Sequence, residues 1–332
     1  MHPATVSRAL RGVAGKVSPA KRAEIEAVAR QLGYQPNIVA ASLRTKRTNI
    51  AAILVPDLAN PLFAPLVKGL EQELRKHEML ALITQPPEEG RERAHLVQEL
   101  VMRQVSGLII LAAEDNDAML EVAAQRKIPT VLVNRGLGER RFSSVVNDDH
   151  ESVELVLAHL RSLGHERIAH IAGPGSSSTG LARKKAFIEL AQQGDPDVSL
   201  IVEARAFTRE EGLTAARQLF EQAGGRYSAI FASNDLLALG VLDWARETGL
   251  SVPADLSLVG HNDMPFIDIV QPPLTTVRIP LADMSRQAAQ MFIDHVNSQG
   301  LATSTRMLRP TLVVRHSTAA PRMRPAGGAS SA

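Results

Sequence analysis

The chain has 332 residues, of which 45% are hydrophobic, and its formal net charge is +2. This length exceeds one typical domain and supplies enough apolar side chains for more than one core. Cysteine is absent, which excludes disulfides, thiolate metal sites and cysteine nucleophiles. The N-terminus does not resemble a signal peptide and no stretch is apolar enough to span a bilayer, so a cytoplasmic location without a membrane partner is expected.

The charge is unevenly distributed along the chain. Residues 1–47 hold nine Lys or Arg against two Glu, a local charge of +7 that leaves −5 for the rest. A basic head on a mildly acidic body indicates that only the head meets a polyanion such as nucleic acid.

Two short helices are expected in the head. Residues 3–10 suit the first, with Pro3 in its opening turn and an apolar face of Val6, Ala9 and Leu10. In the second, Ser18 serves as N-cap before Pro19, and Gly33 ends the helix. Its apolar stripe has helical spacing and consists of Ile25, Val28, Ala29 and Leu32.

Residues 34–49 are expected to form a hinge. Asn37 after Pro36 can begin a helix of only about two turns, which is marginal without support. Leu43 stands among Arg44, Lys46 and Arg47, a composition typical of an apolar wedge entering a DNA minor groove while cations hold phosphates. The alternative is an ordinary linker with solvated charges.

The body alternates between short apolar runs and longer amphipathic segments. Strands are expected at 50–55, 80–84, 107–111, 130–133, 168–172, 200–204, 229–232 and 257–260. Helices are expected at 62–77, 89–103, 118–126, 150–163, 181–192, 208–223 and 236–248. This alternation predicts parallel sheets, whose loops at the carboxyl ends of the strands hold ligands in open α/β folds.

Several short motifs appear in an order that resembles the LacI family of transcription regulators. They are Ala4-Thr5-Val6-Ser7-Arg8-Ala9-Leu10, Leu32-Gly33-Tyr34, Pro36-Asn37, Val55-Pro56-Asp57, Asn60-Pro61-Leu62-Phe63, Val105-Ser106-Gly107-Leu108-Ile109, Leu163-Gly164-His165, Ala172-Gly173-Pro174, Ser233-Asn234-Asp235 and Pro273-Leu274-Thr275-Thr276-Val277. The resemblance covers positions 3 to 316. It implies an α/β protein with a small helical DNA-binding head and a two-lobed effector domain like a periplasmic binding protein, with parallel sheets.

The resemblance also implies how the chain is divided. A partial helix-turn-helix head would occupy 1–33 and the hinge 34–49. The first lobe would comprise 50–147 and 279–309, and the second lobe 148–278 and 310–318. Residues 319–332, rich in Pro, Gly, Ser and Ala, are expected to be a disordered tail.

The head departs from the family pattern because a helix normally precedes the one at Pro3. Our hypothesis is that Met1 is an internal methionine and that the true start lies upstream. The alternative is a truncated form that cannot bind DNA tightly.

The resemblance places effector contacts at or just beyond strand ends, on Leu62, Phe63, Asn134, Arg135, Ser177, Thr179, Arg183, Phe207, Asn234 and Asn262. Relatives commonly carry Asp at the positions of Asn134 and Asn262. Amides there, beside Arg135 and Arg183, favour an anionic ligand, so we hypothesise a sugar acid or a similar hydroxylated metabolite.

The loop at residues 173–180 matches neither a dinucleotide fingerprint nor a Walker loop. The alternative to a ligand role for Thr179 and Arg183 is a plain strand-to-helix turn with Arg183 in solvent. His165 is expected to make a structural hydrogen bond rather than to act in catalysis. The acidic residues of 148–151 precede a helix, where negative charge is favourable, so we expect them to stabilise its N-terminus rather than to bind a metal. Trp244 suits packing.

Together these features predict a repressor of the LacI type, acting as a homodimer on a double-stranded operator and controlled by a small-molecule effector between the lobes. No cofactor, metal site or catalytic residue is expected. The main alternative is a cytoplasmic small-molecule sensor that cannot bind DNA because its head is truncated. A third interpretation, an α/β enzyme, lacks a recognisable nucleophile or cofactor loop.

DNA contacts are expected at Pro3, Ala4, Thr5, Ser7, Arg8, Asn37, Ala40, Leu43 and Arg44. Arg8 is the candidate for base readout, since a guanidinium can bond guanine with two donors, and the alternative is a phosphate contact. If Arg8 reads a base, Arg8→Ala should relax sequence preference at one operator position, by about 1–3 kcal/mol, in binding assays with operator variants. A uniform loss across all sequences would assign Arg8 to a phosphate instead.

Overall fold

The computed structural model describes residues 5, 6, 9, 17–34, 48–111, 113, 114, 117–137, 141–191, 200–298 and 302–322. These residues fall into two compact units, Met1–Thr48 and Asn49–Ala332. Among them, no helix combines the length and the apolar character that crossing a membrane requires.

In the first unit, α2 (Pro19–Gln31) begins and ends where the sequence predicts. The Ser18 hydroxyl accepts from the Lys21 amide at 3.4 Å, and Gly33 has a positive φ of +61°. Within the expected apolar stripe, Ile25 is buried, whereas Val28 and Leu32 are 49% and 75% exposed. Helical spacing tells which side chains share a face, but not whether another element covers that face.

The expected DNA contacts lie mostly outside the described residues. Of these positions only Thr5 is described, and it is helical and half-buried. The others, which are Pro3, Ala4, Ser7, Arg8, Asn37, Ala40, Leu43 and Arg44, stay predictions.

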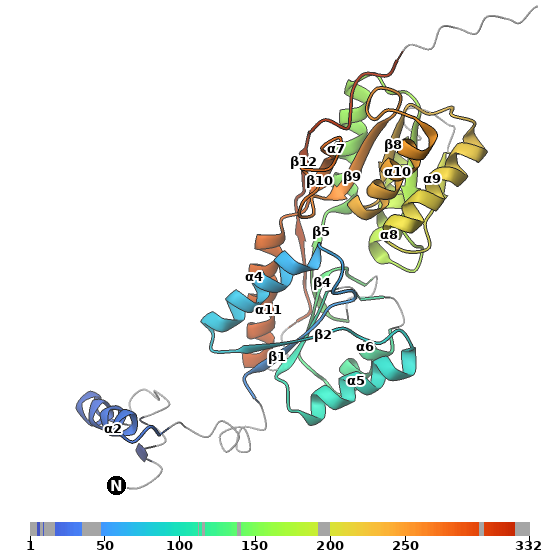
Figure 1. Cartoon of the computed structure of the whole chain (residues 1–332). Coiled ribbons are helices and arrows are strands. Elements are labelled where there is room, and N and C mark those ends of the chain that lie inside the picture. The colour runs from blue at the N-terminus through green and yellow to red at the C-terminus, as the bar shows by residue number, and fades with distance from the viewer. Residues whose placement is uncertain are drawn as a thin grey trace, which may run out of the picture. The chain divides into compact units, whose positions relative to one another are not determined.

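The second unit contains two six-stranded sheets, which confirms the expected pair of α/β lobes (Figure 1). The first sheet has the order β11-β5-β4-β3-β1-β2 and is parallel throughout. Its strands are β1 (Ile50–Leu54), β2 (Leu80–Thr84), β3 (Gly107–Ile110), β4 (Thr130–Asn134), β5 (Ser143–Asn147) and β11 (Thr305–Leu308).

Helices cover both faces of the first sheet, so its central strands are apolar on both sides. One core packs α4 (Phe63–Lys76) and α11 (Leu281–Asn297) on the sheet, and a second packs α5 (Gly90–Met102) and α6 (Ala118–Gln125) on the other face. Because helices cover both faces of the sheet, side chains on both sides of β1 are buried, which explains why its sequence is apolar without interruption.

The second sheet has the order β12-β10-β9-β8-β6-β7, and only β12 runs antiparallel to its neighbour. Its strands are β6 (Ile168–Ala172), β7 (Ile201–Glu203), β8 (Ala229–Ala232), β9 (Ser257–Asn262), β10 (Thr275–Arg278) and β12 (Thr311–Val313). One face packs against α7 (Asp149–Ser162) and α8 (Ser178–Ala191), the other against α9 (Arg209–Ala223) and α10 (Asp235–Thr248).

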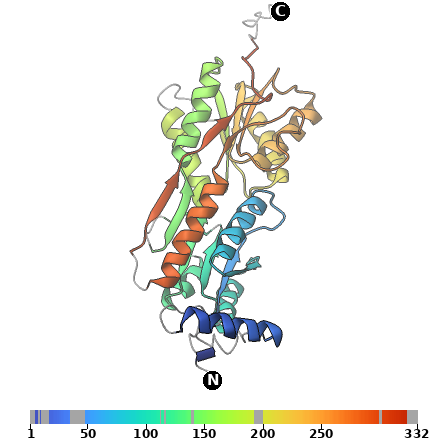
Figure 2. The ribbon, with the colours of Figure 1, turned by 90° about the vertical axis from the view of Figure 1, so that its left-hand side faces the viewer.

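The chain passes between the two sheets three times: from β5 to α7, from β10 to α11, and from β11 to β12. Figure 2 shows α11 and β11 extending away from the second sheet along the first. The sequence analysis did not predict β5, β10, β11, β12 or α11 individually. It also placed the start of α8 three residues too late, because Ser178, Thr179 and Gly180 already belong to that helix.

The expected disordered tail is wrong for its first residues. The Ala319 amide donates to Ser257 Oγ at 3.0 Å, and its carbonyl lies 2.8 Å from His165 Nε2. Arg322 pairs with Asp255 at 2.6 Å. Composition does not reveal these contacts, which Ala319 makes through its backbone and Arg322 through its side chain. Residues 323–332 lie outside the described residues. The structural role expected for His165 is thereby confirmed.

Asp235, the first residue of α10, is a fully buried carboxyl group. It accepts hydrogen bonds from Thr276 Oγ1 at 2.6 Å and from the Met264 amide at 2.8 Å. Burial raises its pKa to about 7 from the ordinary 3.8, against the opposing effect of these hydrogen bonds. The folded protein therefore retains a proton that the unfolded chain releases near pH 3.8.

Stability contributed by the neutral Asp235 carboxyl should be complete below the unfolded pKa and should be lost as the pH rises to about 7. Wild-type protein should lose on the order of 1–3 kcal/mol of unfolding free energy between about pH 5 and about pH 8 from this group, and Asp235→Asn should flatten that slope. Urea unfolding followed through Trp244, on the same helix, measures this difference. Asp243→Asn, at a half-buried carboxylate of α10 paired with Arg209, should keep the wild-type slope. Equal slopes in all three proteins would contradict the assignment.

Candidate ligand-binding cleft

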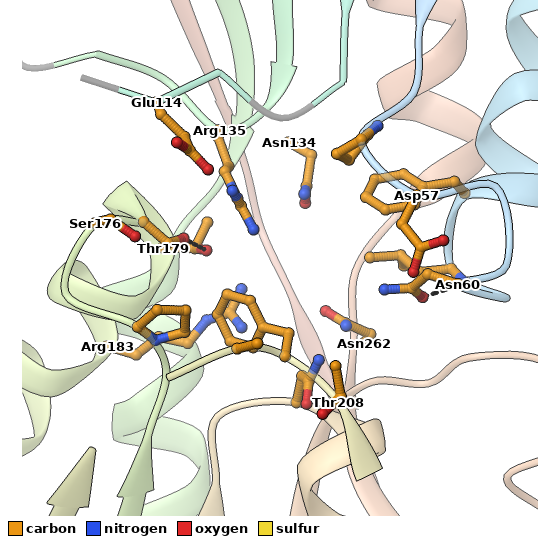
Figure 3. Close-up of a pocket in the computed structure, with 18 of the residues that line it drawn as sticks. Asp57, Asn60, Glu114, Asn134, Arg135, Ser176, Thr179, Arg183, Thr208 and Asn262 are labelled. Carbon is orange, nitrogen blue, oxygen red and sulfur yellow. Dashed lines mark hydrogen bonds between the residues drawn. The ribbon is translucent and has the colours of Figure 1, made fainter. Parts of the chain in front are cut away.

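A cleft of about 280 Å³ opens between the two sheets, at the carboxyl ends of their strands (Figure 3). All ten positions expected to bind an effector line it: Leu62, Phe63, Asn134, Arg135, Ser177, Thr179, Arg183, Phe207, Asn234 and Asn262. The structure thus brings together side chains from both lobes that lie up to two hundred positions apart in the chain.

The cleft also contains polar residues that the sequence analysis did not assign to it, namely Asp57, Asn60, Glu114, Ser176, Arg205 and Thr208. Asp57 and Asn60 follow β1, and Glu114 follows β3. The position of a polar residue just beyond a parallel strand would have identified them, because ligands of such sheets bind at these ends.

Two of the cleft amides have an unusual backbone. Asn134 at the end of β4 has a φ of 70°, and Asn262 at the end of β9 has a φ of 114°. Positive φ is uncommon outside glycine, and asparagine tolerates it better than most residues. Strain of this kind gathers at binding sites, where it fixes the direction of a side chain.

Arg183 is held rigidly in the second lobe. It is 3% exposed, and its Nε donates to Asp149 Oδ1 at 2.9 Å while Nη1 donates to the Ser233 carbonyl at 2.5 Å. The alternative interpretation, a plain turn with Arg183 in solvent, is therefore wrong. Its charge is compensated by Asp149 before any ligand binds.

Arg135 differs from Arg183 because its Nε is buried without a hydrogen-bond partner. Its guanidinium lies 5.5 Å from the centre of the Phe207 ring and points into the middle of the cleft (Figure 3). Burial lowers the pKa of Arg135 to about 10, with the Glu114 carboxylate acting in the opposite direction. The group therefore stays charged at neutral pH and presents a positive charge to the cleft.

The Phe207 ring is placed by Gly173. A Cβ at Gly173 would overlap the ring, so only glycine at the end of β6 lets the aromatic face reach the cleft. Asn234 has a fixed orientation as well, since its Oδ1 caps α10 by accepting from the Leu237 amide at 2.8 Å. Its amide nitrogen is the remaining group that can serve a ligand.

His261 lies behind Asn262 and is fully buried. Its Nδ1 is 3.0 Å from Asn262 Oδ1, and its Nε2 lacks a hydrogen-bond partner at 3.9 Å from Asp149 Oδ1. Burial lowers the pKa of His261 well below its ordinary value, so the ring is neutral. A neutral ring that donates from Nδ1 leaves an acceptor at Nε2. The described residues contain no group of three acids or histidines arranged to hold a metal ion.

Comparisons with known proteins agree with this architecture. A family model described as "Bacterial regulatory proteins, lacI family" matches residues 3–37, and one described as "Periplasmic binding protein-like domain" matches residues 157–318. The chain is 33% identical over 319 residues to the HTH-type transcriptional regulator DegA of Bacillus subtilis (strain 168), covering 95% of this chain and 94% of that one. It is 30% identical over 320 residues to the HTH-type transcriptional repressor CytR of Escherichia coli (strain K12), covering 96% and 93%.

Solved structures show the same relationship. A complex of the transcriptional regulator CelR with cellobiose aligns with a TM-score of 0.76 at 29% identity, covering 96% of both chains. The lac repressor dimer bound to operator and the anti-inducer ONPF aligns with a TM-score of 0.81 at 26% identity, covering 96% of this chain and 95% of that one. The match to the head favours a regulator over a sensor without DNA binding. The chain therefore belongs to the LacI family of bacterial regulatory proteins, which are DNA-binding transcription regulators.

Proposed function

We propose that this protein is a repressor that binds its operator as a homodimer and is controlled by a small hydroxylated metabolite in the cleft. The observation that carries the proposal is the Arg135 guanidinium, which lies over the Phe207 ring and points into a polar cleft between two lobes. The relative CytR is a repressor by name, and the CelR and lac repressor structures hold cellobiose and ONPF.

The charges in the cleft support an oxygen-rich ligand. Arg183 is neutralised by Asp149, and Arg205 by Glu211 at 2.6 Å, so neither needs an anion. Arg135 remains, with Glu114 and Asp57 as carboxylates in the same cleft. The hypothesis of an anionic ligand therefore depends on Arg135 alone, while the carboxylates and amides suit hydroxyl groups. A cavity of about 280 Å³ is at the small end of ligand sites, which suits one or two sugar rings.

Exposed apolar side chains on the first lobe support a homodimer. The edge strand β2 carries Leu80, Leu82 and Ile83, all exposed, and Ile83 also lines an apolar groove of about 370 Å³ with residues of α4. An exposed apolar edge strand invites pairing unless another chain covers it. We assign this surface to the second copy of the chain.

The three connections between the sheets supply a mechanism. A ligand that contacts both lobes shifts the equilibrium between the open and closed arrangements of the lobes. The three connections transmit this shift through the first lobe to residue 49, where the hinge joins it. Coupling between such sites is typically about 1–3 kcal/mol. Effector and operator then alter each other's affinity by the same factor.

Arg135→Met should weaken effector binding by roughly 10- to 100-fold, because the variant removes the donors at the centre of the cleft. Calorimetric titration with a panel of neutral sugars and sugar acids measures this effect and also tests the ligand class. Arg217→Met, the same change at an exposed arginine of α9 paired with Glu247, should bind as wild type does. Equal affinity of the two variants would exclude the cleft as the effector site, and binding of neutral sugars alone would exclude a sugar acid.

Ile83→Glu should convert the dimer to a monomer at micromolar concentration, because a charge would be buried in the apolar contact. Sedimentation velocity measures the change. Met102→Glu, at a 71% exposed position of α5, should leave the dimer intact. If Ile83→Glu sediments as wild type does, the second copy is bound by another surface.

A further inference from the structure

The amino edge of the first sheet, where its parallel strands begin, is the edge opposite the effector cleft. Strand β1 begins at Ile50, so the segment that joins the head to the body enters here. From Tyr34 to Asn49 this segment spans at most about 54 Å in any conformation, because an extended chain covers no more than about 3.6 Å per residue. The chain therefore tethers this edge, and not the cleft, to the DNA-binding head.

The loops before β3 and β4 lie side by side at this edge. The Leu108 amide at the start of β3 donates to the Pro129 carbonyl just before β4, at 2.8 Å. Between them the two loops carry three exposed cations, Arg103 after α5 and Arg126 and Lys127 after α6. We call these three residues the basic edge.

The charges of the basic edge are not compensated within the described part of the chain, where none of the three side chains pairs with a carboxylate. Other cations near this edge are paired: Arg75 of α4 binds Glu71, and Lys76 binds Glu73 at 2.7 Å. Glu78 precedes β2, which β1 separates from β3. The basic edge is thus a local concentration of positive charge on a body whose formal charge beyond the head is −5.

The second lobe shows that this fold does not require cations at its helix ends. Arg103 and Arg126 are the C-caps of α5 and α6, where positive charge favours the helix dipole. The helices α7, α9 and α10 precede strands of the second sheet in the same way, yet they end at Leu163, Gly224 and Gly249. The cations of the first lobe therefore need a reason beyond helix stability.

Lys127 keeps its side chain at a cost in stability. Its φ is +52°, a conformation that glycine adopts readily and that strains other residues. The turns after α7, α9 and α10 place glycine at positive φ, namely Gly164, Gly224 and Gly249. Backbone strain of this kind persists where the side chain has a function.

We propose that the basic edge is a second DNA contact, through which the body binds phosphates of the double helix that the head holds. Guanidinium and ammonium groups bond phosphate oxygens strongly and without reading sequence. The contact extends to the body a role that the overall charge assigns to the head alone. It requires only the DNA binding of the family, and it depends neither on an effector nor on the repressor activity proposed above.

The salt dependence of DNA binding tests this contact, because the logarithm of the association constant falls by about 0.9 per logarithm of salt concentration for each phosphate neutralised. The full chain would be titrated on a labelled random-sequence duplex of about 40 base pairs, between about 50 and 200 mM salt, by fluorescence anisotropy. The triple variant Arg103→Gln, Arg126→Gln and Lys127→Gln should reduce the slope by about 1–3 and weaken binding by roughly 10-fold or more at the lowest salt.

A matched control removes three cations elsewhere. Arg167→Gln, Lys185→Gln and Arg217→Gln change exposed residues of the second lobe and lower the net charge equally. This variant should keep the wild-type slope, since long-range attraction is screened over about 8–10 Å in these buffers. An unchanged slope in the basic-edge variant, an equal loss in the control, or no binding of the duplex by wild type at about 50 mM salt would overturn the proposal.

Lys127→Gly separates a DNA contact from a structural role. The variant should raise the melting temperature by about 1–3 °C, because glycine relieves the positive φ, and it should weaken duplex binding by roughly 2- to 5-fold. Glu78→Gly makes the same backbone change at an exposed acid with a φ of +59°. It should also raise the melting temperature, but it should not weaken duplex binding. If Lys127→Gly binds the duplex as wild type does, or if Glu78→Gly weakens binding equally, the basic edge does not contact DNA.

Discussion

The buried ion pair between Asp149 and Arg183 is the interaction on which the cleft depends. Asp149 is the first residue of α7, directly after the chain crosses from the first sheet, and Arg183 belongs to α8. Arg183 also binds the Ser233 carbonyl, which precedes Asn234 in the cleft. The pair therefore joins the crossing segment to the floor of the second lobe. Removing one partner would leave a buried charge uncompensated, which commonly costs about 3–5 kcal/mol.

Much of this fold could be predicted from the sequence because parallel sheets covered on both faces have a simple pattern. Strands β6 and β8 have the predicted bounds, and the ten residues that the resemblance to the LacI family implied all line one cleft. Pairing between distant residues could not be predicted in this way. The compensation of Arg183 by Asp149 crosses 34 positions, and the anchoring of Ala319 by His165 crosses 154. The exposure of Val28 and Leu32 could not be predicted for a similar reason, because helical spacing does not show whether another element covers that face of the helix.

Helix α10 holds one of the cleft residues in place. Its N-cap, Asn234, lines the effector cleft, and Trp244 on the same helix is buried in the core of the second lobe. The close packing of α9 on α10 keeps this helix in place, because a Cβ at Gly240 would overlap the Arg209 carbonyl. A helix packed in this way keeps Asn234 in a fixed position in the cleft, because binding residues on rigid elements are placed more precisely than those on loops.

Several buried polar atoms that lack hydrogen-bond partners belong to residues in the effector cleft or next to it in the chain. Among the described residues they are Arg135 Nε, Asn147 Oδ1, Ser178 Oγ, Tyr227 Oη and His261 Nε2. Ser178 begins the helix that carries Arg183, Asn147 ends the strand before the first crossing, and His261 lies behind Asn262. Each such atom costs about 1–3 kcal/mol when left unsatisfied, so a core selected for stability alone would eliminate them. Of these residues, Arg135 lines the effector cleft, and Ser178 and His261 are next in the chain to the lining residues Thr179 and Asn262. The second lobe therefore accepts a cost in stability beside its binding site, where the direction of Thr179 and Asn262 matters more than complete pairing behind them.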